Sequence, residues 1–283
     1  MRFFCHFGIF CFCDKTSMTF TLYLLFLFLV LLLIGNISTL LFQDYFIFRP
    51  EKLGEGYEYD FLHPFEEHWV ETPGGGRINL LWFRQGERAG ERVIVYYHGN
   101  MGSLKRWGHV YYHLLALGYD LIIYDYRGFG KSTGPRNEHR MQQDALAVYA
   151  FAERRYQAQN IVLYGRSLGS HFAAFVARNS SCRMLILETP FSSMRDLFHA
   201  YFPFLPRVFR FKYAFDNKAL LPEIEVPIHI FHGTKDLVVP YKVALELKPL
   251  IKKTDTFTTI EDGRHGDLLF FDRFNDQLKN ILS

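Results

Sequence analysis

The chain has 283 residues, of which 49% are hydrophobic, and its 32 basic residues nearly balance its 29 acidic ones. So apolar a chain can bury ample surface, which excludes global disorder and allows one large α/β domain. The net charge of +3 is too small to indicate a nucleic-acid partner. Cys5, Cys11 and Cys13 crowd the N-terminus and only Cys182 lies further along, so the cysteines do not form a disulfide framework.

The N-terminal segment is strongly apolar, with no charged side chain in residues 16–43. A helix needs roughly 20 apolar residues to cross a bilayer core, so this run is long enough. A cleaved signal peptide has a shorter apolar region of about 7–15 residues and then a small-residue cleavage site, which we do not find here. We therefore predict an uncleaved, single-pass membrane anchor within residues 1–43, in contact with lipid over residues 18–42.

The residues that flank the apolar run leave two alternatives open. Two basic residues precede it and two follow it, so the positive-inside bias favours neither orientation. These residues are Arg2 and Lys15 before the run, and Arg49 and Lys52 after it. Cys11 and Cys13 are candidates for acylation, although unmodified thiols at the membrane edge fit equally well.

Beyond the anchor, residues 44–76 contain turn-forming glycines and predict a linker and an entry hairpin, followed by a domain over residues 77–283. In that domain short apolar runs alternate with amphipathic stretches, a rhythm that predicts a mostly parallel sheet flanked by helices. The predicted strands are Ile78–Phe83, Val93–Tyr97, Leu121–Tyr124, Ile161–Tyr164, Met184–Leu187, Ile228–Phe231 and Asp255–Ile260. The predicted helices are Leu104–Leu117, Arg140–Arg155, Ser170–Arg178, Lys242–Ile251 and Phe270–Leu282.

The strongest local signal is the sequence Gly-Arg-Ser-Leu-Gly over residues 165–169, between a predicted strand and a predicted helix. A nucleophile elbow requires this context, because a sharp strand-to-helix turn lifts the serine hydroxyl above the edge of the sheet. Gly165 and Gly169 fit positions where strand and helix come too close for side chains. The pattern therefore predicts Ser167 as a catalytic nucleophile.

A serine nucleophile needs a base and an acid that orients the base, in the chain order Ser, Asp or Glu, His. Asp236 follows the predicted strand Ile228–Phe231, and His265 follows the last predicted strand, so both fit the order. Glu188, at the end of another strand, is a rival acid. We predict Ser167, Asp236 and His265 as the catalytic triad.

An acyl-transfer site also needs donors for the oxyanion. One is expected to be the backbone N–H of Leu168, directly after the nucleophile, and the other to come from the loop after an early strand. The glycine-containing loop over residues 97–102 has that position. We assign its donor to the backbone N–H of Asn100, with Met101 as the alternative.

These ordered motifs resemble the α/β-hydrolase superfamily. The motifs are Tyr-His-Gly-Asn at 97–100, Tyr-Asp-Tyr-Arg-Gly-Phe-Gly-Lys-Ser at 124–132, the 165–169 elbow, Phe-His-Gly-Thr-Lys-Asp at 231–236, and His265. Within it the chain is most similar to small, single-pass membrane-anchored serine hydrolases, which include bacterial peptidase-like proteins and eukaryotic α/β-hydrolase-domain proteins. The resemblance implies the fold and the triad from about Arg77 onward. One departure is Arg264 before the histidine, where the family often has a smaller residue.

Two other motifs do not hold. Gly130-Lys131-Ser132 resembles the end of a phosphate-binding loop, but the required earlier glycine is Asp125. His229 and His232 lack a third ligand at suitable spacing, so we predict no metal, and the expected chemistry needs no cofactor.

The stretch between Glu188 and Pro227 is too long for a simple crossover and predicts a short cap insertion at about residues 190–226. Its aromatic side chains alternate with basic ones. Three interpretations stay open: a compact cap packed on the domain, a wall for an acyl chain, or a face that rests on an anionic bilayer.

The sequence thus predicts a membrane-anchored serine hydrolase that cleaves ester, thioester or amide bonds through an acyl-serine intermediate, with a lipid-like or acylated substrate. No obligate protein partner is evident. The alternatives are a serine peptidase for short peptides and a non-catalytic scaffold of the same fold.

Overall fold

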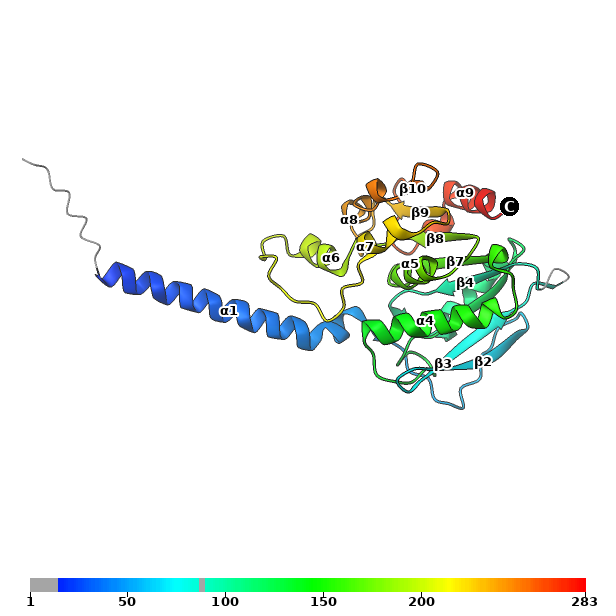
Figure 1. Ribbon diagram of the computed structural model, residues 1–283, viewed down its shortest axis with the longest axis horizontal. Coiled ribbons are helices and arrows are strands. Elements are labelled where there is room, and N and C mark those ends of the chain that lie inside the picture. Colours follow the sequence, from blue (N-terminus) through cyan, green and yellow to red (C-terminus); the bar gives the residue numbers. More distant parts are fainter. Residues whose placement is uncertain (1–14, 87–89) are drawn as a thin grey trace, which may run out of the picture.

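The structure is a computed structural model that describes residues 15–86 and 90–283 (Figure 1). Cys5, Cys11 and Cys13 lie outside the described residues. An eight-stranded sheet with the order β10-β9-β8-β7-β4-β6-β3-β2 forms the centre of the domain. The strands are β2 Phe65–Thr72, β3 Gly76–Phe83, β4 Val93–Tyr97, β6 Asp120–Tyr124, β7 Ile161–Arg166, β8 Met184–Glu188, β9 Ile228–Gly233 and β10 Thr256–Ile260.

The strands from β6 to β10 along this sheet pair in parallel, and only β2 and β3 run antiparallel to their neighbours. This arrangement confirms the predicted α/β fold with a mostly parallel sheet. Because the carboxyl ends of parallel strands meet at one edge, the loops after β4, β7, β8 and β9 gather there, together with the loop after β10.

Helices cover both faces of the sheet (Figure 1). They are α2 Leu104–Trp107, α3 Tyr111–Leu115, α4 Glu138–Glu153, α5 Gly169–Asn179, α6 Met194–Tyr201, α7 Asn217–Leu220, α8 Tyr241–Leu245 and α9 Asp272–Leu282. Alternate residues of the central strand β4 face opposite sides: Val95 joins the core beneath α4 and α5, and Ile94 joins the core beneath α3 and α9. The strands have continuous apolar sequences because both faces of the sheet are buried.

Two helices differ from their predicted form. The expected helix Leu104–Leu117 is divided into α2 and α3 by a 3₁₀ turn at Gly108–Val110. A Cβ atom at Gly108 would lie 2.3 Å from the ring of Phe61, so a side chain at this position would not fit against that ring. The helix expected at Lys242–Ile251 ends at Leu245, and a 3₁₀ turn that contains Pro249 follows, because proline lacks the N–H that would continue the helix.

The N-terminal helix α1, Lys15–Ile47, projects away from the domain (Figure 1). Its segment Met18–Ile47 is long and apolar enough to cross a membrane, and the most apolar part of it is not buried against the protein. This helix supports the predicted single-pass anchor. It continues beyond Gln43 and ends just before the strand β1, Arg49–Pro50, which pairs with β5, Met101–Gly102.

The segment between β8 and β9 contains α6, a long irregular loop and α7. We call residues 190–226 the cap. Its loop after α6 reaches back to the C-terminal part of α1 (Figure 1), where the backbone N–H of Arg210 donates to Asn36 Oδ1 over 3.0 Å.

Candidate active site

The turn between β7 and α5 holds Ser167 in a left-handed conformation, with φ of 52°. A non-glycine residue rarely adopts such a φ, and the strain is typical of functional turns. The two glycines of the motif make the turn possible. A Cβ atom at Gly165 would lie 2.5 Å from the Gly169 carbonyl oxygen, and one at Gly169 would lie 1.8 Å from the carbonyl oxygen of Tyr97. The turn therefore has the geometry of a nucleophile elbow.

The three residues predicted as a triad lie together in hydrogen-bond distance. His265 Nε2 is 3.0 Å from Ser167 Oγ, and His265 Nδ1 is 2.7 Å from Asp236 Oδ2. Because the carboxylate only accepts hydrogen bonds, Nδ1 carries the proton and Nε2 is free to accept the serine proton. Asp236 has a fully buried side chain, whereas the His265 side chain is 20% exposed. The His265 imidazole is thus partly open to solvent, whereas the Asp236 carboxylate is shielded from water.

Asp236 is fixed by its own loop. Its Oδ1 accepts hydrogen bonds from the backbone N–H groups of Val238 and Val239, both over 2.8 Å. The buried His232 lies nearby, 3.4 Å from Asp236 Oδ2, and its Nε2 donates to the Val239 carbonyl oxygen over 2.9 Å. Burial lowers the pKa of His232, which outweighs the opposing effect of Asp236. A neutral His232 therefore supports the loop and leaves Asp236 to pair with His265.

Glu188, the rival acid, forms a different interaction. Its Oε1 lies 3.2 Å from Nε of Arg166, and its Oε2 accepts a hydrogen bond from Tyr164 over 2.7 Å. Arg166 also donates to the carbonyl oxygen of His265 over 3.1 Å, and its guanidinium lies 5.4 Å from the centre of the Trp107 ring. Arg166 thus ties the nucleophile strand to the histidine loop, a link that the sequence analysis missed.

A signal for this pair exists in the sequence. Arg166 directly precedes the nucleophile, and Glu188 ends the next strand, so the two are register partners at the ends of neighbouring parallel strands β7 and β8. An opposite-charge pair at such positions predicts an ion pair once the strand order is known.

The residues expected to donate to the oxyanion lie in the turn of Ser167 and in the loop after β4. Leu168 is the N-cap residue of α5, and Gly99 lies close enough that a Cβ atom there would be 3.8 Å from Ser167 Cβ. Among the described residues, neither the backbone N–H of Leu168 nor that of Asn100 has a hydrogen-bond acceptor. Unpaired backbone donors in the turn of Ser167 and in the loop after β4 are suited to a developing oxyanion.

The loop that carries Asn100 is held by the exit of the anchor. The Asn100 side chain donates to the carbonyl oxygen of Ile47 over 2.8 Å, and the Asn100 carbonyl oxygen accepts from the backbone N–H of Arg49 over 2.9 Å. Ser103, at the end of this loop, donates to Glu51 over 2.8 Å. The end of α1 and one side of the candidate oxyanion site are therefore part of one hydrogen-bonded unit.

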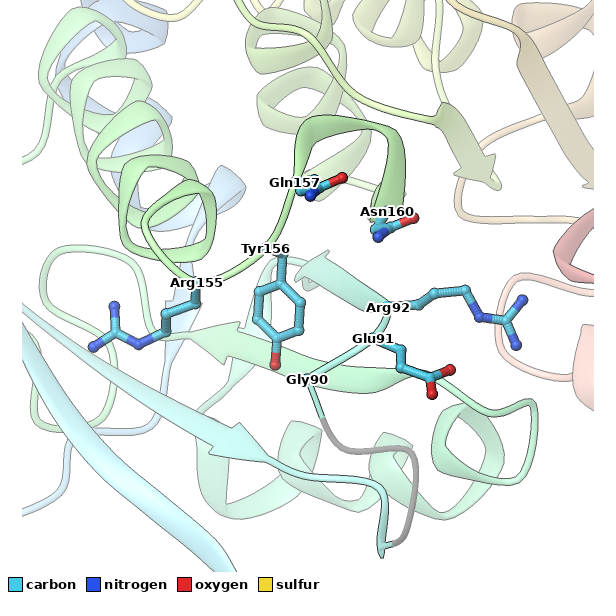
Figure 2. A pocket seen from close by; sticks show the side chains of 7 residues that line it. All are labelled: Gly90, Glu91, Arg92, Arg155, Tyr156, Gln157 and Asn160. Atoms are coloured by element: carbon cyan, nitrogen blue, oxygen red, sulfur yellow. The ribbon is translucent and has the colours of Figure 1, made fainter.

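A polar hollow of about 510 Å³ lies elsewhere, among residues that include Arg92, Arg155, Tyr156 and Asn160. Figure 2 shows Arg92 and Arg155 extending to opposite sides of Tyr156. Arg92 and Asn160 precede β4 and β7, so this hollow lies at the amino ends of the strands, away from Ser167. In the part of the chain that the structure describes, no group of three or more His, Cys, Asp or Glu side chains is arranged to hold a metal.

Comparisons with known proteins report on the fold and on the relatives of the chain. A family model described as "alpha/beta hydrolase fold" matches residues 92–219. The chain is 29% identical over 234 residues to lysophosphatidylserine lipase ABHD12 of Danio rerio, covering 71% of this chain and 61% of the relative. It is 31% identical over 199 residues to the same lipase of Gallus gallus, covering 62% and 52%. The chain thus spans between half and about three fifths of the length of these relatives.

Solved structures share the fold. The esterase Pf2001 of Pyrococcus furiosus superposes with a TM-score of 0.66 at 17% identity, over 83% of this chain and 96% of the esterase. An esterase from Exiguobacterium antarcticum superposes with a TM-score of 0.60 at 20% identity, over 77% of this chain and 99% of the esterase. With the elbow, the sheet order and the matched region 92–219, these similarities show that the chain has the α/β-hydrolase fold.

Proposed function

We propose that the chain is a membrane-anchored serine hydrolase that cleaves the acyl ester of a lipid through an acyl-serine intermediate. One observation supports the proposal most strongly. Ser167 Oγ, in a strained turn, lies 3.0 Å from His265 Nε2, and Asp236 Oδ2 accepts a hydrogen bond from His265 Nδ1 over 2.7 Å. A hydroxyl, an imidazole and a buried carboxylate in this order are what acyl transfer to serine requires.

In the proposed reaction, Ser167 Oγ attacks the ester carbonyl while its proton moves to His265 Nε2. Asp236 holds the imidazole in the required tautomer and stabilises the imidazolium that forms. The backbone N–H groups of Leu168 and Asn100 donate to the oxyanion, and His265 then protonates the departing alcohol. Water, deprotonated by the same imidazole, attacks the acyl-serine and releases the fatty acid, which restores Ser167.

The substrate class follows from the anchor and the relatives. A catalytic domain attached to a membrane-spanning helix is held at the lipid surface, where lipid esters are concentrated and water-soluble ones are not. The curated relatives act as lipases on lysophosphatidylserine, a phospholipid with one acyl chain. We therefore propose a lysophospholipid as the substrate, with the acyl ester as the bond that is broken.

The test uses full-length protein in lipid vesicles and measures both labelling by a fluorophosphonate probe and fatty-acid release from lysophosphatidylserine. A short-chain nitrophenyl ester and an aminoacyl nitroanilide report esterase and peptidase activity. We expect labelling and ester hydrolysis by wild type and neither by Ser167→Ala. Labelling without lipid hydrolysis would overturn the substrate, and absence of labelling in folded protein would overturn the serine mechanism.

A further inference from the structure

The aromatic side chains of the cap divide into two sets. Phe209, Tyr213 and Phe215 are buried, which is the compact packing expected of a cap. The loop that follows α6 carries the second set, which is exposed: Phe204 is 98% exposed and Val208 is 57% exposed. We call the exposed apolar residues of this loop the cap ridge; they are Phe202, Phe204, Leu205 and Val208. Large apolar side chains gathered in one exposed loop indicate an interaction surface.

The anchor helix determines where the cap ridge lies relative to a membrane. The candidate span Met18–Ile47 has 30 residues, which at about 1.5 Å per residue gives about 45 Å, close to the full thickness of a bilayer with its headgroups. The cap contacts this helix within the span: a Cβ atom at Gly35 would lie 2.9 Å from the ring of Phe209, and Asn36 accepts from Arg210. The loop that carries the cap ridge is therefore held beside the membrane-spanning helix.

Side chains on α1 indicate the level of the membrane boundary. Tyr45 and Phe46 are both exposed near the end of the helix, and aromatic residues are enriched at the boundary between hydrocarbon and headgroups. Gly35 precedes Phe46 by 11 positions, or about 16 Å of helix, so the cap contact lies on the bilayer side of these aromatics. That distance is about half of the roughly 30 Å hydrocarbon core, so the cap contact lies inside the leaflet and the loop that carries the cap ridge is held against it.

The charge of the loop selects the kind of surface. Residues 197–215 contain Arg207, Arg210 and Lys212 and no acidic residue. Lys212 pairs with Asp44 of the anchor, whereas Arg207 and Arg210 form no ion pair with any described residue. An apolar ridge flanked by unpaired arginines complements a bilayer surface that contains anionic headgroups.

The apolar surface continues to the candidate active site. The Tyr201 hydroxyl bonds the carbonyl oxygens of Leu237 and Val238 over 2.8 and 2.7 Å. Leu237 directly follows Asp236 and is 83% exposed. Tyr201, directly before the cap ridge, thus joins the cap to the loop that carries Asp236 and the exposed Leu237.

We infer that the cap ridge, together with Leu237 and Val238, inserts into the headgroup region of the leaflet where α1 ends, in bilayers that contain anionic lipid. The anchor tethers the domain, and the cap ridge sets its orientation on the surface. This inference goes beyond the proposed function, because insertion does not depend on catalysis.

The experiment measures insertion in full-length protein with Ser167→Ala, so that catalysis plays no part. A tryptophan is placed at Phe204 and, as a matched control, at Leu62, which is 99% exposed. Leu62 lies three residues before Phe65. Phe65 pairs with Phe83, and Phe83 pairs with Leu121 at the amino end of β6. Leu62 is therefore at the edge of the sheet opposite Ser167. The parent with only Trp69, Trp82 and Trp107 gives the baseline.

In vesicles of phosphatidylcholine with a minority of phosphatidylserine and brominated acyl chains, we expect strong quenching of Phe204→Trp, protection of it from iodide, and neither effect for Leu62→Trp. Quenching of Phe204→Trp should weaken when phosphatidylserine is omitted or when Arg207 and Arg210 are replaced by glutamine. Iodide access equal to that of Leu62→Trp would overturn the inference. Protection without brominated-lipid quenching would also overturn it, since another copy of the chain would then cover the cap ridge.

A second measurement uses active protein. Phe204→Ser with Val208→Ser is expected to lower hydrolysis of vesicle-embedded lysophosphatidylserine several-fold and to leave hydrolysis of a soluble nitrophenyl ester unchanged. Equal hydrolysis of the embedded lipid by both proteins would contradict a role of the cap ridge at the surface. Failure of the proposed function appears differently, as absence of lysophosphatidylserine hydrolysis in wild type itself.

Discussion

The carboxyl edge of the sheet and the junction between anchor and cap are both built from hydrogen bonds between distant parts of the chain, yet they are assembled differently. At the sheet edge, Ser167, Asp236 and His265 each come soon after a strand whose register fixes their position. At the junction, Gln43 of α1 bonds the irregular cap segment 210–213, whose backbone has no regular partner strand. The first region is positioned by the sheet and the second by individual side chains.

This difference separates what the two regions contribute. The sheet edge is rigid and strained, with the left-handed Ser167 enclosed by close glycine contacts, as preorganised catalysis requires. The junction determines how the domain sits on its anchor and on lipid. Changes at the sheet edge should therefore affect chemistry or folding, whereas changes at the junction should affect the cap without altering the reacting groups.

The largest effect is expected for Ser167→Ala. Loss of the nucleophile should lower kcat by about 10⁶-fold, the cost of removing the nucleophile from a serine protease. Fluorophosphonate labelling should disappear, while the unfolding midpoint changes little because alanine fits the same turn. Labelling that persists in this variant would show that another residue is the nucleophile.

A smaller loss is expected for Asp236→Asn, which keeps the shape but disturbs the tautomer of His265. The expected decrease in kcat is about 10⁴-fold. The matched control is Glu188→Gln, since Glu188 is also a buried acid at a strand end but pairs with Arg166. We expect Glu188→Gln to lower kcat far less. The reverse order of the two effects would transfer the role of orienting acid to Glu188.

Gly169→Ala tests the packing of the same edge. The new Cβ atom would overlap the carbonyl oxygen of Tyr97 at 1.8 Å, and a backbone atom cannot move aside as a flexible side chain can. We expect the free energy of unfolding to fall by about 3 kcal/mol, measured by denaturant titration in detergent. Gly54→Ala is the control, because no atom lies within 4 Å of its added methyl group, and it should leave stability unchanged.

The proximity of Ser167, Asp236 and His265 could be predicted from the sequence, because parallel strands bring their carboxyl ends together at one edge of the sheet. The sharp turn at Ser167 could also be predicted, because the glycines at 165 and 169 fit positions where no side chain has room. The pair of Arg166 and Glu188 needed the strand order, which a single sequence does not supply. The roles of the three triad residues stay a prediction that their geometry supports.

The junction was not predictable in the same way. The side chain of Gln43 bonds Lys212 and Tyr213, which follow it in the chain by 169 and 170 residues. No periodicity or motif in the sequence indicates this contact. The bond from Asn100 to Ile47 is equally irregular. The division of the helix expected at Leu104–Leu117 falls at Gly108, where the ring of Phe61 packs closely, and helical spacing in the sequence does not indicate this tertiary contact.

The smallest effect on chemistry is expected for Gln43→Ala at the junction. Gln43 is nearly buried, and its Oε1 accepts from the backbone N–H groups of Lys212 and Tyr213 over 2.8 and 3.2 Å. Removing the acceptor leaves these donors unpaired, which should cost about 1–3 kcal/mol in the local stability of the cap.

Hydrogen exchange should therefore accelerate over residues 209–215, whereas Phe42→Ala, at the neighbouring but exposed position, should leave exchange there unchanged. The rate of labelling by a small fluorophosphonate should stay at the wild-type value in both variants, because Ser167, His265 and Asp236 follow strands of the sheet and form no hydrogen bond with residues 209–215. If Gln43→Ala instead lowered labelling as strongly as Asp236→Asn, the junction would have to control the triad itself. The bond from Asn100 to the end of α1 would then be the connection to examine, since it joins the anchor to the loop beside Ser167.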